Sequence, residues 1–308
     1  MHFRLFCLRS FLMGFIELHE TQTMKKPMSI ASARLVTLLL MALPLAVPHA
    51  TAQNSSRDNF KNAKTVTDGG VMRPNPYDKF IALDNALGAD GIKWKEVMNR
   101  TEVNIDPDTI KDTKVGIPAL LGFRICDGVM AIKARDAEKL NSCANHIEKM
   151  GKKLGVTDED LRRAKMVRSF ATRGEWGRVF LELGYLQQDI ERVLQRESGE
   201  GGKAPVRKIL YAAGWLQGAR YTSNLVNDHY SKKTAGILRE PLLVKELKAD
   251  LDSTGMPEAP IIKMMSEAMA ELQKLVNVEL RQPLDEKSVK EMAKLTSKTV
   301  LDCVKEAK

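Results

Sequence analysis

The chain has 308 residues, of which 44% are hydrophobic, 28% charged and 6% aromatic, and its formal net charge is +9. This composition is that of a globular protein with a sizeable core, and it excludes a fully disordered chain, a collagen-like chain and a polytopic membrane protein. The sequence also lacks the short motifs of dinucleotide-binding folds, P-loops, zinc proteases and covalent haem attachment. The composition therefore indicates a globular protein with a hydrophobic core, and no motif identifies an activity.

The N-terminal region has the three parts of a secretory signal peptide. An apolar run covers residues 35–47, basic residues precede it, and an Ala-Thr-Ala sequence ends at Ala52. A bilayer-spanning helix needs ~20 apolar residues, so this run favours a cleaved signal over a retained anchor. We therefore predict a signal peptide over residues 1–52, whose translated start is Met24, and a mature protein that begins at Gln53. The predicted location is periplasmic or secreted, with no transmembrane segment after cleavage.

Residues 53–75 are polar and contain adjacent glycines, which predicts a disordered tether before an all-helical domain over 76–308. The first helix is expected from about Tyr77 to Leu87, and a second, short one surrounds Trp94 and Met98. The Asp-Pro-Asp sequence at 106–108 is typical of a turn that starts a helix.

The clearest helical pattern covers residues 121–154, where one face recurs every three or four positions. Asp136 is the only charged residue on that face. Two interpretations follow: a continuous helix buries Asp136, or the helix breaks there and Asp136 caps a second one. We favour the break, because the residues after Asp136 suit the start of a helix.

Further helices are expected over residues 158–171, 174–197, 205–230, 241–251, 259–277 and 286–306. Helix 205–230 is apolar on most of its circumference, which is typical of a central helix. Because we find no convincing alternating pattern, a sheet is not predicted. The predicted fold class is all-α: a single bundle of roughly seven to nine helices.

A polar line on helix 205–230 is the strongest candidate for a functional site. Gln217, Arg220 and Asn224 continue a face that begins with apolar residues. If Arg220 is buried, it needs a partner, because an isolated buried charge is very costly. Asp136 is the first candidate for the paired carboxylate and Asp127 the second. Gln187, which like Asp136 interrupts another apolar face, is a further candidate partner in the network. These polar residues either surround a ligand site, form a structural network, or lie at an exposed end of the helix.

No metal and no cofactor is predicted. Cys143 and His146 are three residues apart on one helix, but a zinc site needs about four ligands, and no paired-ligand motif is present. The three cysteines after the leader, Cys126, Cys143 and Cys303, are too few for a disulfide framework.

Basic residues are concentrated between 149 and 173, where only Asp158, Glu159 and Asp160 oppose them. This surface predicts either a solvated face or contact with an anionic envelope component or an acidic protein. Nucleic acid is not predicted as a partner, because the predicted export and the lack of interleaved aromatic residues disfavour it. The basic residues are Lys149, Lys152, Lys153, Arg162, Arg163, Lys165, Arg168 and Arg173.

Three segments, 124–141, 173–190 and 212–226, resemble uncharacterised exported helical proteins of Verrucomicrobia-type bacteria. The resemblance implies export and an α-helical fold, and it implies no activity.

These observations favour a non-enzymatic periplasmic or secreted helical protein that acts as a binding or scaffold module. One alternative is an envelope enzyme with a polar site around Arg220, Asn224 and Asp136, although no nucleophile–base pair is visible. A metal or haem carrier is the third hypothesis, and the scarcity of histidines weakens it.

Overall fold

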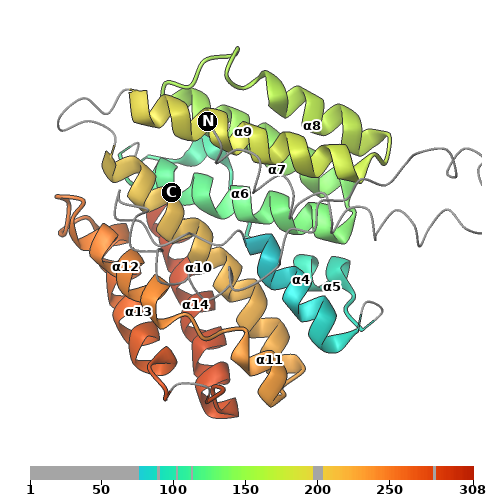
Figure 1. The fold of residues 1–308 in the computed structure, drawn as a ribbon. Helices are drawn as coiled ribbons and strands as arrows, with labels where there is room; N and C mark the ends of the chain where they lie inside the picture. Colours follow the sequence, from blue (N-terminus) through green and yellow to red (C-terminus); the bar gives the residue numbers. More distant parts are fainter. Residues whose placement is uncertain (1–75, 89–90, 102, 112–113, 197–203, 280–281) are drawn as a thin grey trace, which may run out of the picture. The chain divides into compact units, whose positions relative to one another are not determined.

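Eleven α-helices and one 3-10 helix, η2, make up the regular structure of the described residues, and no strand occurs among them. This computed structural model describes residues 76–308 except 89–90, 102, 112–113, 197–203 and 280–281 (Figure 1). The elements are α4 (Pro76–Leu87), α5 (Trp94–Thr101), η2 (Pro107–Thr109), α6 (Gly116–Ala134), α7 (Ala137–Lys153), α8 (Arg162–Thr172), α9 (Trp176–Arg196), α10 (Ala204–Asp228), α11 (Lys232–Gly236), α12 (Pro241–Asp252), α13 (Pro260–Val276) and α14 (Glu286–Ala307).

The all-α prediction is confirmed, but the expected number of helices, seven to nine, is exceeded. The five-residue helix α11 was not predicted, because its pattern is too short to show a period; a capping box between Ser231 and Thr234 starts it. Helix α8 begins at Arg162 rather than at 158, because a turn covers the residues before it. The predicted signal peptide (1–52) and tether (53–75) lie outside the described residues. No helix among those described is long and apolar enough to cross a bilayer.

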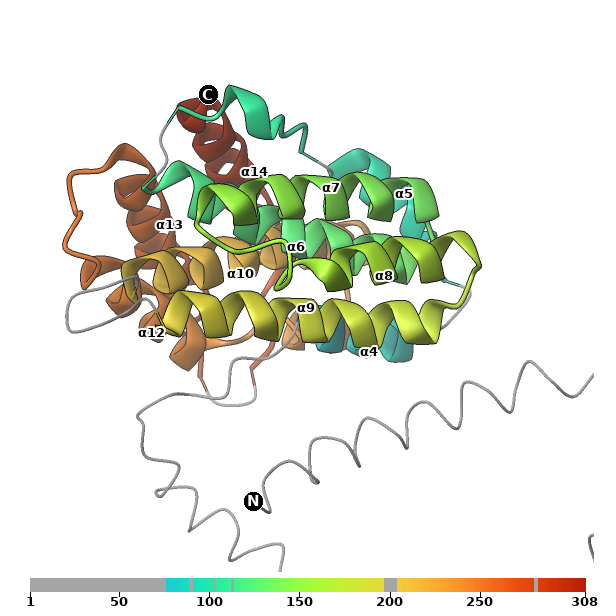
Figure 2. The same cartoon turned by 90° about the horizontal axis from the view of Figure 1, so that it is seen from above.

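Helix α6 lies at the centre of the bundle. All of its residues except Ile125 and Lys133 are buried, and it contacts α4, α5, α7, α9, α10 and α14. Helices α7, α8 and α9 lie on one side of α6, and α12, α13 and α14 lie on the other (Figure 1). From above, α7, α8 and α9 run side by side (Figure 2). The predicted central helix, α10, therefore shares the centre with α6.

The two central helices touch backbone to backbone at a pair of glycines. A Cβ atom placed on Gly122 of α6 would lie 2.3 Å from the carbonyl oxygen of Leu210 and 2.9 Å from the backbone nitrogen of Gly214, both on α10. Only residues without a side chain allow this approach. The close contact at Gly122 sets the position of α10 along α6, and thus which polar residues of the two helices face each other.

The predicted break at Asp136 is confirmed. Helix α6 ends at Arg135, which has a left-handed backbone (φ 50°), and Asp136 is the N-cap of α7. Its carboxylate accepts a hydrogen bond from the backbone nitrogen of Lys139 at 3.1 Å. The chain therefore turns back, and α7 packs against α6.

We expect Asp136→Ala to lower the free energy of unfolding by ~0.5–2 kcal/mol, because the amide of Lys139 loses its acceptor at the start of α7. Urea denaturation followed by circular dichroism measures the change. Asp136→Asn, which keeps a capping oxygen, should retain most of the stability; an equal loss in both variants would contradict the capping role.

Candidate functional site

A buried carboxylate organises the polar contacts between α6 and α10. Asp127 is fully buried, and its Oδ1 accepts hydrogen bonds from Nε2 of Gln217 at 2.6 Å and from the hydroxyl of Tyr221 at 2.9 Å. Its Oδ2 accepts one from Nη1 of Arg124 at 3.1 Å. Three donors from two helices therefore stabilise one negative charge inside the core.

The network continues from α6 to α7. Arg124 is buried one turn before Asp127, and its Nε donates to Nδ1 of His146 at 3.1 Å. An imidazole nitrogen accepts a hydrogen bond only when it carries no proton. The contact therefore requires Nδ1 of His146 to be unprotonated. Burial, with the nearby charge of Asp127, raises the pKa of Tyr221 well above its usual value, so the phenol keeps its proton and donates.

Arg220 is buried, as predicted, with only 6% of its surface exposed. The expected pairing with a carboxylate is wrong: within the described part of the chain, Arg220 makes no ion pair and its Nε and Nη1 have no hydrogen-bond partner. Asp136 is used as the cap of α7, and Asp127 is engaged by Arg124, Gln217 and Tyr221. Burial lowers the pKa of Arg220 in spite of the nearby charge of Asp127.

The other predicted residues of the polar line contribute to helix packing. Asn224 is partly buried and donates through Nδ2 to the hydroxyl of Ser297 on α14 at 3.1 Å and to the carbonyl of Arg220 at 2.8 Å. Gln217 belongs to the Asp127 network. The side chain of Gln187 lies outside what the structure describes. Gln217 is therefore hydrogen-bonded to Asp127, whereas Asp136 forms no hydrogen bond or ion pair with Arg220 or Asn224 among the described residues.

Sequence reasoning missed three members of the network: Arg124, Tyr221 and His146. A signal was present for the first of them, because Arg124 and Asp127 are charged residues one turn apart in the otherwise apolar start of helix α6. Residues three apart on a helix share a face and can pair. Tyr221 and His146 carry no such local signal, because their contacts join different helices.

The cysteines do not form a metal site. Cys126, Cys143 and Cys303 are buried and none of them is in a disulfide. Burial raises the pKa of the Cys303 thiol to about 12 and raises that of Cys126 well above its usual value. Across the described ranges, no group of three or more His, Cys, Asp or Glu side chains is placed to hold a metal ion.

The predicted basic surface is largely neutralised by acids that come from elsewhere in the chain. Six of its eight members form ion pairs; Lys153 donates to the carbonyl of Pro107, and Lys165 has no ion-pair partner among the described residues. The distances include 2.6 Å from Lys149 to Asp108 and 2.8 Å from Arg163 to Glu182. Because five of the seven paired acids lie outside 149–173, a count along the sequence overstates the local positive charge. The paired acids are Asp108, Glu148, Asp158, Glu159, Glu175, Glu182 and Asp189.

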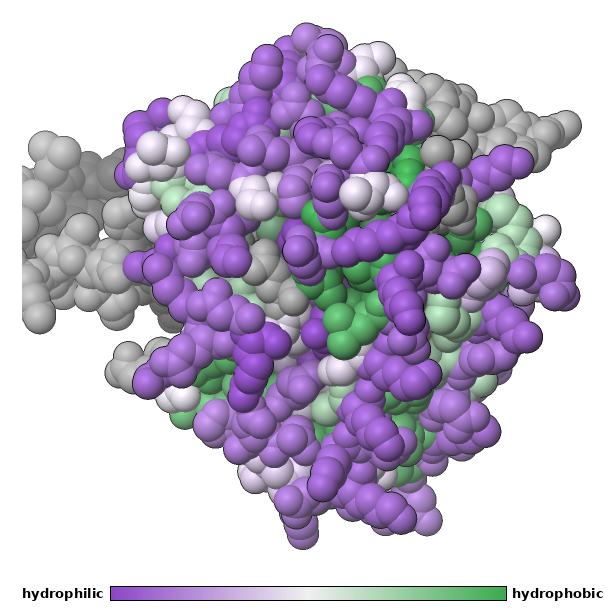
Figure 3. All heavy atoms as spheres, turned by 180° about the vertical axis from the view of Figure 1, so that it is seen from behind, coloured by the Kyte–Doolittle hydropathy of each residue, from purple (hydrophilic) through white to green (hydrophobic). Residues whose placement is uncertain are grey.

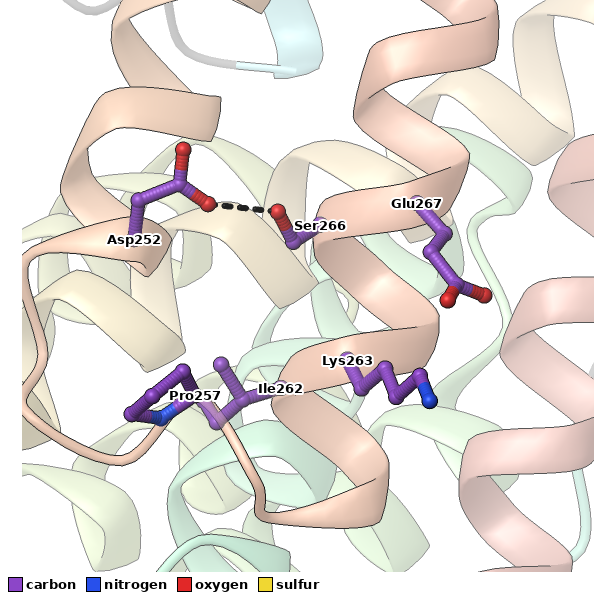
Figure 4. Close-up of a pocket in the computed structure, with 6 residues that line it drawn as sticks. All are labelled: Asp252, Pro257, Ile262, Lys263, Ser266 and Glu267. Atoms are coloured by element: carbon purple, nitrogen blue, oxygen red, sulfur yellow. Dashed lines mark hydrogen bonds between the residues drawn. The ribbon is translucent and has the colours of Figure 1, made fainter.

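A small surface pocket of about 120 Å³ lies between α12 and α13. Figure 4 shows Asp252 and Ser266 pointing toward one another, and Ser266 donates to the carboxylate at 2.6 Å; Lys263 and Glu267 project away from them. Hydrogen bonds from Lys248 and Ser266 lower the pKa of Asp252. Because the carboxylate of Asp252 is already bonded and that of Glu267 projects away from it, the pocket offers no candidate chemistry.

The chain matches no protein-family model, no curated protein and no solved structure. Function must therefore be argued from the residues themselves.

Proposed function

We propose that the protein is exported to the periplasm or beyond and acts there as a non-enzymatic helical scaffold that binds an acidic protein. The observation that carries this proposal is a surface on the α8–α9 hairpin, here called the hairpin patch. It consists of Arg163, Met166, Phe170, Arg178, Leu181 and Tyr185. The leader in the sequence supports the compartment, and the hydrogen bonds of Asp127 to Arg124, Gln217 and Tyr221, which join α6 to α10, support a scaffold.

The hairpin patch is held together by two contacts between arginines and aromatic rings. The guanidinium of Arg163 lies 4.8 Å from the centre of the Tyr185 ring, and that of Arg178 lies 5.4 Å from the centre of the Phe170 ring. These pairs join α8 to α9 at two heights, and Met166 and Leu181 lie between them along their helices. Because α8 and α9 pack against each other as an antiparallel pair, the six residues share one region of surface.

The exposure and composition of the patch are typical of a protein interface. Met166, Leu181 and Tyr185 are each more than a third exposed, and methionine, aromatic residues and arginine are enriched where proteins bind one another. The face shown in Figure 3 is mainly hydrophilic, with hydrophobic side chains visible in the centre and in smaller areas between the hydrophilic ones.

The charges on this hairpin favour an acidic partner. Arg178 is 66% exposed, whereas its paired carboxylate, Glu175, is 32% exposed. Arg192 is 54% exposed and its partner Asp189 only 15%. The guanidinium groups therefore stand further out than the acids that pair with them, so the outer surface is positive to an approaching protein.

Site-specific photocrosslinking tests the proposal. A photoreactive amino acid at Tyr185 should give one discrete adduct with an acidic protein in the exported fraction, and the same residue at Lys274, exposed on α13, should give none. Mass spectrometry of that fraction should find a chain that begins at Gln53.

Charge reversal provides the matched variant. Arg178→Glu should abolish the adduct at Tyr185, because it places a negative charge against the partner. An adduct that survives this change, a product with the mass of two copies of the chain, an adduct with lipid, or no adduct at all would contradict the proposal.

A further inference from the structure

The buried charges of the protein do not balance. Lys79, Arg124 and Arg220 are the cations that are at least nine-tenths buried among the described residues. Lys79 is paired with Glu240, and Arg124 with Asp127. One positive charge, on Arg220, is left without a carboxylate of its own. An uncompensated buried charge is very costly, so a counter-charge is expected beside it.

The atoms that lack partners indicate the kind of group that would fit. Nε and Nη1 of Arg220 are buried donors without acceptors, and Oε1 of Gln217 is a buried acceptor without a donor. The two residues are three apart on α10, so they lie on the same face of the helix, one turn apart. A single group that satisfies both must carry a negative oxygen for Arg220 and a hydroxyl for Gln217.

We propose that Arg220 and Gln217 bind a small oxyanion that carries its own hydroxyl group, such as hydrogen phosphate or bicarbonate. The guanidinium donates to oxygens of the anion from Nε and Nη2, which share one edge of the group and form the side-on fork for which arginine is well suited, while Nη1 points to the opposite side. The hydroxyl of the anion donates to Oε1 of Gln217, while Nε2 of Gln217 continues to donate to Asp127. The proposal does not depend on the hairpin patch, which lies on other helices.

Thermal unfolding in buffers of matched ionic strength tests the site, with each of four sodium salts in turn: phosphate, bicarbonate, sulfate and chloride. An anion that binds only the folded state raises the melting temperature, by roughly 3–6 °C at ten times its Kd. Phosphate or bicarbonate should give this rise. Sulfate and chloride should not, because neither carries a hydroxyl group at neutral pH. Whichever of phosphate and bicarbonate gives the larger rise identifies the source of the oxyanion.

Three variants assign the effect to Arg220. Arg220→Met keeps the length of the side chain and removes its charge, so it should lose the anion-dependent rise. Arg239→Met is the matched control, because Arg239 also has a buried Nε without a partner, although its Nη2 donates to the carbonyl of Val278 at 2.9 Å. The control should keep the rise. If Arg220→Met does not fold, Arg220→Lys, which lacks the planar fork, should weaken anion binding by at least about tenfold.

Three results would overturn the proposal. The first is a wild-type melting temperature that does not respond to either hydroxyl-bearing anion, which would leave water as the group beside Arg220. The second is an equal response in the variants of Arg220, which would place the anion on the outer surface. The third is a response to sulfate as large as that to phosphate, which would remove Gln217 from the site. None of these results bears on crosslinking at Tyr185, so the two proposals fail independently.

Discussion

Gly122→Ala is expected to destabilise the protein by about 3 kcal/mol or more, because the added methyl group overpacks the contact between α6 and α10. The added Cβ would lie 2.3 Å from the carbonyl oxygen of Leu210 and 2.9 Å from the nitrogen of Gly214. Both atoms belong to the backbone of α10, so no side chain can turn away to make room. Helices α6 and α10 would have to separate. Urea denaturation followed by circular dichroism gives the free energy of unfolding.

Gly184→Ala is the matched control for this experiment. Gly184 lies inside α9, and a Cβ atom placed there meets nothing within 4 Å. Alanine is favoured over glycine in a helix by ~1 kcal/mol, so this variant should be slightly more stable than the wild type. Equal effects of the two substitutions would show that the contact between α6 and α10 is not as close as described.

Asp127→Asn is expected to cost ~3–5 kcal/mol, because it removes the negative charge that compensates Arg124 inside the core. The substitution keeps the shape of the side chain, so the loss reports charge and hydrogen bonding rather than an empty space. The amide nitrogen would also face a donor, because Oδ2 of Asp127 accepts from Nη1 of Arg124. Chemical denaturation at neutral pH measures the change.

A double variant distinguishes charge compensation from general damage to the core. Asp127→Asn combined with Arg124→Met should lose less stability than the sum of the two single changes, because the pair is removed together. Glu271→Gln serves as a surface control: its ion pair with Lys274 is exposed, so the change should be within ~1 kcal/mol. Strict additivity in the double variant would contradict a coupled pair.

The helical periodicity was sufficient to predict the all-α class and the positions of the long helices. Most long helices bury one face and show a regular spacing, whereas α6 is buried almost all round. Signals such as Asp136 before α7 and Pro241 at the start of α12 mark helix starts. Helix α11 has only five residues, so no period can develop. The close contact at Gly122 was also beyond prediction, because a glycine inside a helix does not reveal which backbone approaches it.

The burial of Arg220 could be predicted from its place on the inner face of α10. The residues that surround it could not be predicted from the sequence. A sequence pattern assigns a residue to a face of its own helix. It does not give the point along each helix at which two neighbouring helices cross. In this protein, the crossing of α6 and α10 places Asp127 within hydrogen-bond distance of Gln217 and Tyr221. The same reasoning explains the basic surface, where the acids that pair with Arg163 and Arg168 of α8 come from α9 and α7.

The three buried thiols provide internal probes of local unfolding. A thiol must be exposed and deprotonated before it reacts with an alkylating reagent. Cys126, Cys143 and Cys303 are all buried while the helices remain packed, and burial raises the pKa of Cys126 and Cys303. Their labelling rates therefore report how often each part of the core opens. Cys126 lies in α6, Cys143 in α7 and Cys303 near the end of α14. The natural protein can thus be followed at three separate places by mass spectrometry, without an introduced label, to learn whether its helices open one by one or all together.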